Sequence, residues 1–121
     1  MTMREAVLII DDDPSCRELV GILGQIWGIQ VFEAADCSAG LRILQRDKDR
    51  IRLILLDYFM PGMQPVDCSA ALKATAGPSI PIVLITAAVD PAVRAAELKL
   101  NHWVSKPFDM SVLEALFKEA A

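Results

Sequence analysis

Polar side chains that could do chemistry follow four short apolar runs of the sequence. They are Asp11, Asp12 and Asp13 after residues 6–10, Asp57 after 53–56, Thr86 after 80–85 and Lys106 after 102–105. Clustered carboxylates repel one another unless a cation neutralises them or a proton is retained. With no His or Cys among them, they favour a hard ion such as Mg²⁺. A metal, a lysine and a hydroxyl beside Asp57 suit a phosphoryl group, toward which a carboxylate can act as nucleophile.

Each of these residues also has a simpler interpretation when it is taken alone. Asp57 could close a turn or cap a helix, and Asp13 is better explained as the N-cap of a helix that begins at Pro14. Thr86 alone is an ordinary strand-end hydroxyl, and Lys106 alone is a surface lysine. Their positions at the ends of four different strands favour the joint interpretation as one site.

The elements that position these residues can be predicted from the apolar pattern. The continuous runs at 6–10, 53–56 and 80–85 indicate strands buried on both faces, and weaker strands are expected at 30–33 and 102–105. Caps and breakers predict intervening helices, which span about 14–27, a stretch including 39–44 capped by Asp36 or Ser38, 65–76, 91–98 and a last segment with Val112, Leu113, Leu116 and Phe117.

Apolar spacing also predicts which helix faces point inward. For the first helix these are Cys16, Leu19, Val20, Leu23, Ile26 and Trp27; for the helix at 65–76 they are Val66, Ala70 and Leu72. Strands that alternate with helices predict an α/β chain with a parallel sheet and right-handed crossovers. Ligands of such sheets bind beyond the carboxyl ends of the strands, where all the candidate side chains should converge.

Composition limits the possible classes of protein. With 121 residues, 54% hydrophobic and 23% charged, the chain is predicted to be a single globular domain over residues 1–121. A net charge of −4 without a basic stripe argues against direct nucleic-acid or membrane binding. The three cysteines, Cys16, Cys37 and Cys68, show no CxxC spacing and are interpreted as thiols in the core. The amino terminus matches no signal peptide or membrane span, so a cytoplasmic location is expected.

Four motifs together resemble the receiver domain of bacterial response regulators, over about residues 7–117. They are Val7–Pro14, Leu55–Gly62, Pro81–Ala87 and Trp103–Phe108. Each motif is weak alone, but the four in this order are specific. The resemblance implies a doubly wound (βα)5 fold with strand order 2-1-3-4-5 and helices on both faces of the sheet. It also implies a phosphorylation-dependent switch of a two-component system, which is a signalling domain and not a dedicated enzyme.

The resemblance further implies roles for individual residues at the site. Asp57 would accept a phosphoryl group from a phosphohistidine on a sensor kinase or phosphotransfer protein. Mg²⁺ would be held by Asp11, Asp12, Asp57 and the backbone carbonyl of Phe59. Lys106, joined to Pro107 by a cis peptide, would pair with Asp57 and later with the phosphoryl oxygens.

Transmission of the signal is implied for the residues around Thr86. This hydroxyl would move to bond the phosphoryl group, and Trp103 would follow it, changing a face that binds an output domain, a protein partner or a second copy. Trp103 stands where relatives mostly carry Tyr or Phe, Pro65 replaces a customary Gly, and Lys99–Leu100 replaces a frequent Gly-Ala pair. Phe59 and Ala88, at positions that tune hydrolysis in relatives, cannot orient water, so a long-lived phosphoryl group is expected.

Two other functions remain open from the residues. Asp11-Asp12-Asp13 after a strand offers a D-x-D pattern, in which Asp11 would be the nucleophile of a metal-dependent phosphohydrolase. That enzyme would need a cap or substrate pocket, and the chain is expected to have no spare residues for either. A receiver-like domain that binds partners independently of phosphorylation is the other alternative, although Asp12, Asp57, Thr86 and Lys106 are all present.

Overall fold

A five-stranded parallel sheet forms the centre of the protein, in a computed structural model that describes residues 5–119. The strand order is β2-β1-β3-β4-β5, which confirms the predicted topology. The bounds are β1 Ala6–Ile10, β2 Gln30–Ala34, β3 Ile51–Asp57, β4 Ile82–Thr86 and β5 Trp103–Ser105. Every residue of β1 and β4 is buried, as expected for strands covered on both faces.

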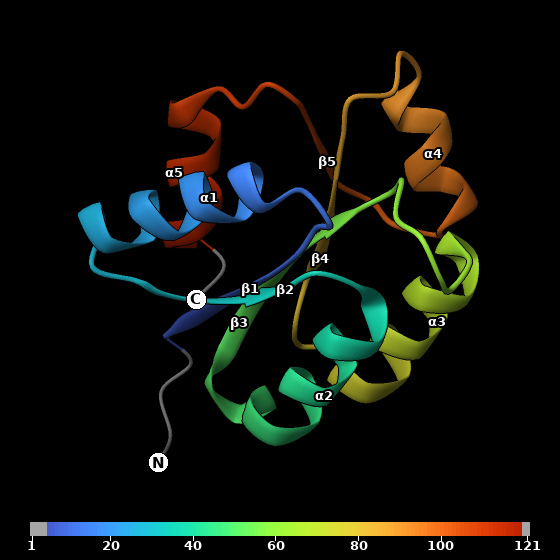
Figure 1. Ribbon diagram of the computed structural model, residues 1–121, viewed down its shortest axis with the longest axis horizontal. Coiled ribbons are helices and arrows are strands. Elements are labelled where there is room, and N and C mark those ends of the chain that lie inside the picture. Colours follow the sequence, from blue (N-terminus) through green and yellow to red (C-terminus); the bar gives the residue numbers. More distant parts are fainter. Residues whose placement is uncertain (1–4, 120–121) are drawn as a thin grey trace.

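Helices cover both faces of the sheet. Their bounds are α1 Pro14–Ile26, α2 Cys37–Asp47, α3 Pro65–Ala76, α4 Pro91–Glu97 and α5 Met110–Glu119, with a short 3₁₀ turn, η1, at Lys48–Arg50. Helices α1 and α5 lie on one face, and α2, α3 and α4 lie on the other (Figure 1). Alternate residues of the central strands enter the two apolar cores: Leu8 and Ile54 face α2 and α3, whereas Val7 and Leu55 face α1 and α5.

Capping residues set the helix boundaries close to the predicted positions. Asp13 caps α1 by accepting a hydrogen bond from the Ser15 N–H at 2.9 Å, and Asp36 caps α2 through the Ala39 N–H at 2.8 Å. Gly28, with φ of +71°, turns the chain out of α1. The predicted span of α3 and the cis peptide between Lys106 and Pro107 are also confirmed.

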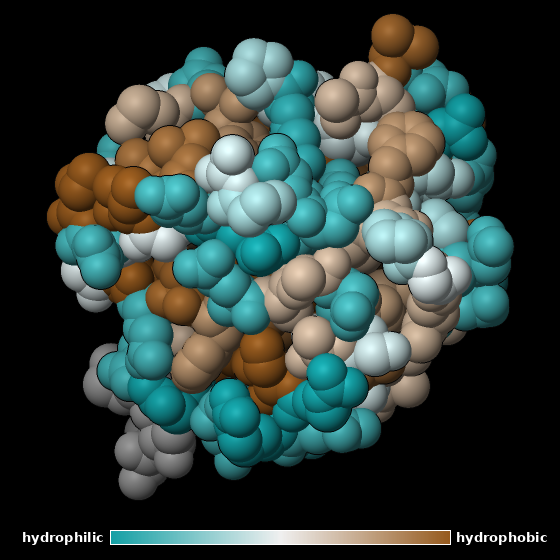
Figure 2. All heavy atoms as spheres, in the orientation of Figure 1, coloured by the Kyte–Doolittle hydropathy of each residue, from teal (hydrophilic) through white to brown (hydrophobic). Residues whose placement is uncertain are grey.

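The prediction of inward-facing residues was partly wrong. Leu19 and Ile26 of α1 are 46% and 69% exposed, and Val66 of α3 is 55% exposed. Ala70 is exposed as well. A helix lying on a sheet buries only one stripe of its surface, and both helices carry more apolar residues than that stripe can cover. Apolar atoms accordingly gather at the outer end of α1 in Figure 2.

The interpretation of all three cysteines as core thiols was also wrong. Cys37 and Cys68 form a disulfide, with their Cα atoms 6.0 Å apart, and Cys16 remains a buried free thiol. The pair is separated by 31 residues and meets only because α2 and α3 pack side by side. The spacing of cysteines in the sequence therefore carried no signal of this bond. Within residues 5–119, no helix is long and apolar enough to cross a membrane.

Candidate functional site

The carboxyl ends of β1, β3 and β5 bring the predicted acids and the lysine together. Asp57 is the last residue of β3, Asp11 directly follows β1, and Lys106 directly follows β5. Asp57 is 7% exposed and Asp11 is fully buried, so neither carboxylate lies on open surface. Parallel strands explain this convergence, because their carboxyl ends meet at one edge.

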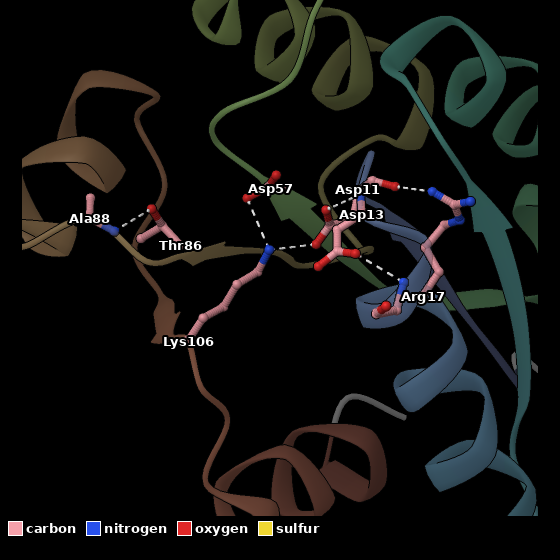
Figure 3. Close-up of polar contacts among 8 residues, drawn as sticks. Asp11, Asp13, Arg17, Asp57, Thr86, Ala88 and Lys106 are labelled. Carbon is pink, nitrogen blue, oxygen red and sulfur yellow. Dashed lines mark hydrogen bonds and ion pairs between the residues drawn. The ribbon is translucent and has the colours of Figure 1, made fainter.

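Lys106 links the two buried carboxylates. Its Nζ donates a hydrogen bond to Asp11 Oδ2 at 2.6 Å and another to Asp57 Oδ1 at 3.4 Å (Figure 3). Because its bond to Asp11 is the shorter, Lys106 interacts more strongly with Asp11 than with Asp57. Asp57 is therefore the less strongly neutralised of the two acids, and its second oxygen is left without a contact to Lys106.

The electrostatics of the two carboxyl groups differ for the same reason. Burial raises the pKa of Asp57 to about 7, the negative charge of Asp11 acts in the same direction, and Lys106 only partly opposes them. Burial also disfavours the charged form of Asp11, but hydrogen bonds from Lys106 and from the Asp13 N–H hold its pKa below the usual range. Burial opposes the charge on Lys106, yet its bond to Asp11 and the charge of Asp57 raise its pKa.

Asp11, Asp12 and Asp57 can hold a metal ion together. Each offers a carboxylate oxygen, and these oxygens lie within 4.8 Å of one another. Two of the acids are buried and Asp12 is exposed, so a cation would keep part of its water shell. Because the donors are all carboxylate oxygens and lack a soft ligand, the set fits Mg²⁺. Participation of the Phe59 carbonyl remains a prediction.

Thr86 and Trp103 lie outside the bonded cluster. Thr86 ends β4, and its buried Oγ1 accepts a hydrogen bond from the Ala88 N–H at 3.1 Å (Figure 3). Its backbone carbonyl accepts a hydrogen bond from the Lys106 N–H at 2.9 Å, which ties it to the strand that carries the lysine. Trp103 begins β5 and is 43% exposed. Their switching roles remain predictions.

Two supporting contacts were missed from the sequence. Arg17, one turn into α1, donates to the Asp11 carbonyl at 2.6 Å and so fixes the end of β1. Tyr58, directly after Asp57, donates its hydroxyl to Glu97 of α4 at 2.6 Å. No signal pointed to Arg17, because its partner is a backbone atom, but the position of Tyr58 beside the central acid could have been noticed.

Comparison with known proteins agrees with this geometry. Residues 7–118 match the family described as the response regulator receiver domain. The chain belongs to this family. Receivers act as phosphorylation-dependent switches in two-component systems, so the general function of the domain is signalling.

The amino-acid sequence of the receiver is similar to those of several response regulators and transcriptional regulators. It is 35% identical over 116 residues to the DNA-binding response regulator MtrA of Mycolicibacterium smegmatis, covering 94% of this chain and 49% of that protein. It is 30% identical over 118 residues to the phosphate regulon transcriptional regulatory protein PhoB of Pseudomonas aeruginosa, covering 94% and 50%. The receiver thus spans about half the length of these curated relatives.

Solved structures share the fold. The chemotaxis response regulator CheY4 of Vibrio cholerae has a TM-score of 0.81 at 25% identity, covering 96% of this chain and 98% of that one. The response regulator TrrA of Thermotoga maritima, solved in complex with Mg²⁺ and BeF, has a TM-score of 0.81 at 22% identity, covering 97% and 99%. These likenesses confirm the doubly wound architecture.

Proposed function

We propose that Asp57 accepts a phosphoryl group in a Mg²⁺-dependent reaction and that the phosphorylated receiver changes its affinity for a partner. The observation that carries the proposal is the position of Asp57: it is buried at the end of β3, within reach of Lys106 and beside two further carboxylates. A bound Mg²⁺ would neutralise the negative charge that develops on the transferred group.

The residues of the receiver have separate tasks in this reaction. Asp57 is the nucleophile, and its deprotonated form is needed to attack phosphorus. Asp11 and Asp12 hold the cation with Asp57, and Lys106 stays within 3.4 Å of the acceptor to meet the incoming oxygens. Thr86 would exchange its bond with Ala88 for one to the phosphoryl group, which moves the loop after β4.

The partners follow from the same proposal. The donor is a phosphohistidine on a sensor kinase or phosphotransfer protein, and the output is an attached domain, a protein partner or a second copy that contacts the face near Trp103. We propose that residues 1–121 form a single receiver that works in the cytoplasm and leaves nucleic-acid binding to other parts of a regulator. Neither Phe59 nor Ala88 has a side chain that can orient water for hydrolysis. We therefore expect the phosphoryl group to persist for minutes and not seconds.

The alternative phosphohydrolase is less well supported by the geometry. Asp11, its nucleophile, is fully buried and accepts hydrogen bonds from Lys106 and from the Asp13 N–H, which occupy both of its carboxylate oxygens. An acid held in this way is a poor nucleophile compared with Asp57. Hydrolysis of phosphate esters that requires Asp11 but not Asp57 would favour the alternative.

The test is the intact mass of the protein after incubation with acetyl phosphate, with and without Mg²⁺. Wild type should gain one phosphoryl group only when Mg²⁺ is present, and Asp57→Asn should gain none. Asp13→Asn is the matched control, because Asn also caps helices and, among residues 5–119, the Asp13 side chain bonds only within the α1 cap. An unmodified wild type with intact fold, or an equal adduct on Asp57→Asn, would contradict the proposal.

A further inference from the structure

The bond between Cys37 and Cys68 is not used by phosphoryl transfer and needs its own explanation. Cys37 opens α2, and Cys68 lies in the first turn of α3, so the disulfide ties together the starts of two helices. Both residues are buried, at 3% and 1% exposed, among the side chains of one core. The Cα separation of 6.0 Å is ordinary for a disulfide, so the two helices can pack in this way with the bond formed.

A hollow in the surface borders one of the two cysteines. A surface hollow of about 290 Å³ is lined by Cys37 and by Pro61, Gly62 and Met63 of the loop after β3. Cys68 does not line it, so Cys37 is the cysteine of the pair that borders the hollow. The loop on the wall of the hollow joins Asp57 to α3 and contains Phe59.

The third cysteine cannot interfere with exchange at this pair. Cys16 lies on α1 and packs in the core on the opposite face of the sheet, together with residues of α5. Cys16 is itself buried there, with the sheet between it and the pair. Only Cys37 and Cys68 are therefore placed to react with each other.

We infer that Cys37 and Cys68 form a reversible redox site, opened by dithiol reductants through the hollow at Cys37 and closed by low-molecular-weight disulfides. In reduction, a reductant thiolate attacks the Cys37 sulfur, the Cys37–Cys68 bond breaks, and Cys68 leaves with the electron pair and takes a proton. The second reductant thiol then closes on the first, which releases Cys37 as a thiol and leaves the reductant as a cyclic disulfide. The protein gains two electrons and two protons, and the dithiol loses them.

The state of this pair should affect the loop that holds the acceptor, a consequence that rests on the proposed function. Cys68 lies three residues into α3 from Pro65, where the loop after β3 ends. Breaking the bond frees the start of α3 from α2 and so loosens the anchor of this loop. We expect the oxidised protein to accept phosphoryl groups from acetyl phosphate several-fold faster than the reduced protein.

The first test counts alkylated thiols by intact mass, after native protein is equilibrated with dithiothreitol or oxidised glutathione and then alkylated in denaturant. Oxidised protein should carry one alkyl group and reduced protein three, and repeated cycling should interconvert them. Cys16→Ser, the control, should give none and two. Three groups after oxidation, or one group after treatment of the native protein with excess dithiol, would overturn the reversible site.

The second test compares the redox states in thermal melts and in phosphorylation by acetyl phosphate. The oxidised form should melt about 10 °C higher, as expected for a crosslink that closes a loop of this length. Cys37→Ala/Cys68→Ala should lose both responses, whereas Cys16→Ser should keep them. Equal phosphorylation rates in the two states would overturn the link to the acceptor loop. Absence of phosphorylation in both states would instead count against the proposed function and leave the alkylation result standing.

Discussion

At the scale of single residues, the site depends on how one lysine is shared between two buried acids. Lys106 Nζ lies 2.6 Å from Asp11 and 3.4 Å from Asp57, so it neutralises the negative charge of Asp11 more fully than that of Asp57. Burial raises the pKa of Asp57 to about 7 and the longer bond from Lys106 only partly offsets it, whereas hydrogen bonds from Lys106 and the Asp13 N–H outweigh burial and hold the pKa of Asp11 below its usual range. Asp57, the less neutralised acid, should therefore be stabilised most by a bound cation.

Removing the lysine charge should impair the acceptor. In Lys106→Met, both acids lose their hydrogen-bonded cation, and the transferred group loses a positive partner. We expect phosphorylation by acetyl phosphate to slow by about tenfold or more. Lys118→Met is the matched control, because Lys118 pairs with Glu114 on the surface of α5. Rates of phosphorylation followed by intact mass would check this, and unchanged kinetics in Lys106→Met would remove the lysine from the mechanism.

The raised pKa of Asp57 predicts how stability varies with pH when Mg²⁺ is absent. Because the folded-state pKa is about 7 and the ordinary value is 3.8, the folded protein binds this proton more tightly than the unfolded chain. Ionised Asp57 therefore destabilises the fold increasingly as pH rises from about 4 to 7. Asp57→Asn should be more stable than wild type at pH 8, by about 1–3 kcal/mol, and this difference should shrink toward pH 5.

Urea unfolding in EDTA at several pH values measures this effect, and Asp13→Asn again serves as control. The control should follow wild type at every pH, since the Asp13 side chain bonds, within the described part of the chain, only in the exposed cap of α1. If the stability gained by Asp57→Asn instead grew toward acid pH, the result would contradict the prediction that buried, ionised Asp57 destabilises the fold.

At the scale of elements, the loop after β3 is joined to α4 by a small polar network. The Tyr58 hydroxyl donates to Glu97 at 2.6 Å, and Arg94 binds the other oxygen of Glu97 at 2.8 Å. The Arg94 guanidinium also lies 5.5 Å from the centre of the Tyr58 ring. Since Tyr58 follows Asp57 directly, this network joins the acceptor loop to α4 by contacts that do not involve Thr86 or Trp103.

Breaking this connection should loosen α4. In Tyr58→Phe, the hydroxyl bond to Glu97 is lost, at a cost of about 1 kcal/mol of stability. Amide hydrogen exchange within Pro91–Glu97 should speed up, while exchange in the central strands stays unchanged. Glu114→Gln, which breaks an ion pair on α5, is the control and should leave α4 unaffected. Unaltered exchange in α4 of Tyr58→Phe would show that the network does not hold the helix.

Prediction from the sequence succeeded where local signals set the structure. Strand order aside, which came from the family resemblance, the buried runs and caps such as Asp13 and Asp36 determine each element within a few residues of the chain. Convergence of Asp11, Asp57 and Lys106 followed from the parallel sheet. These features depend on neighbouring residues and on one general rule of topology.

Features that depend on distant packing were not predicted. The Cys37–Cys68 bond and the Tyr58–Glu97 bond both join segments far apart in the sequence, whose contact depends on how neighbouring helices on one face pack against the sheet. The exposure of Leu19 and Ile26 has a similar origin. Their spacing is that of residues on the buried face of a helix, but the face that α1 buries against the sheet is too narrow to include them. Apolar residues at helical spacing therefore overstate the width of the core.

At the scale of the whole molecule, we expect the receiver to unfold as one cooperative unit whose folded state is stabilised when the site is occupied. Beryllium fluoride imitates a phosphoryl group on a carboxylate, and Mg²⁺ completes the charge balance around it. The two together should raise the melting temperature by several degrees, because they bind the folded state only.

Adding Mg²⁺ or beryllium fluoride alone makes this prediction specific. Mg²⁺ alone should produce a smaller rise in melting temperature, and beryllium fluoride alone should produce none. Asp57→Asn should lose the combined effect, whereas Asp13→Asn should keep it. An equal rise in Asp57→Asn would place the ligand elsewhere on the molecule.

The central claim is that the phosphoryl group is carried by the carboxylate of Asp57. Protein phosphorylated with acetyl phosphate and Mg²⁺ can be treated with borohydride, which reduces an acyl phosphate to an alcohol and converts the modified aspartate to homoserine. Peptide mass spectrometry should then find homoserine at position 57 and unchanged aspartate at 11, 12 and 13. Homoserine at position 11, or a phosphorylated protein with no reduced aspartate, would contradict the account.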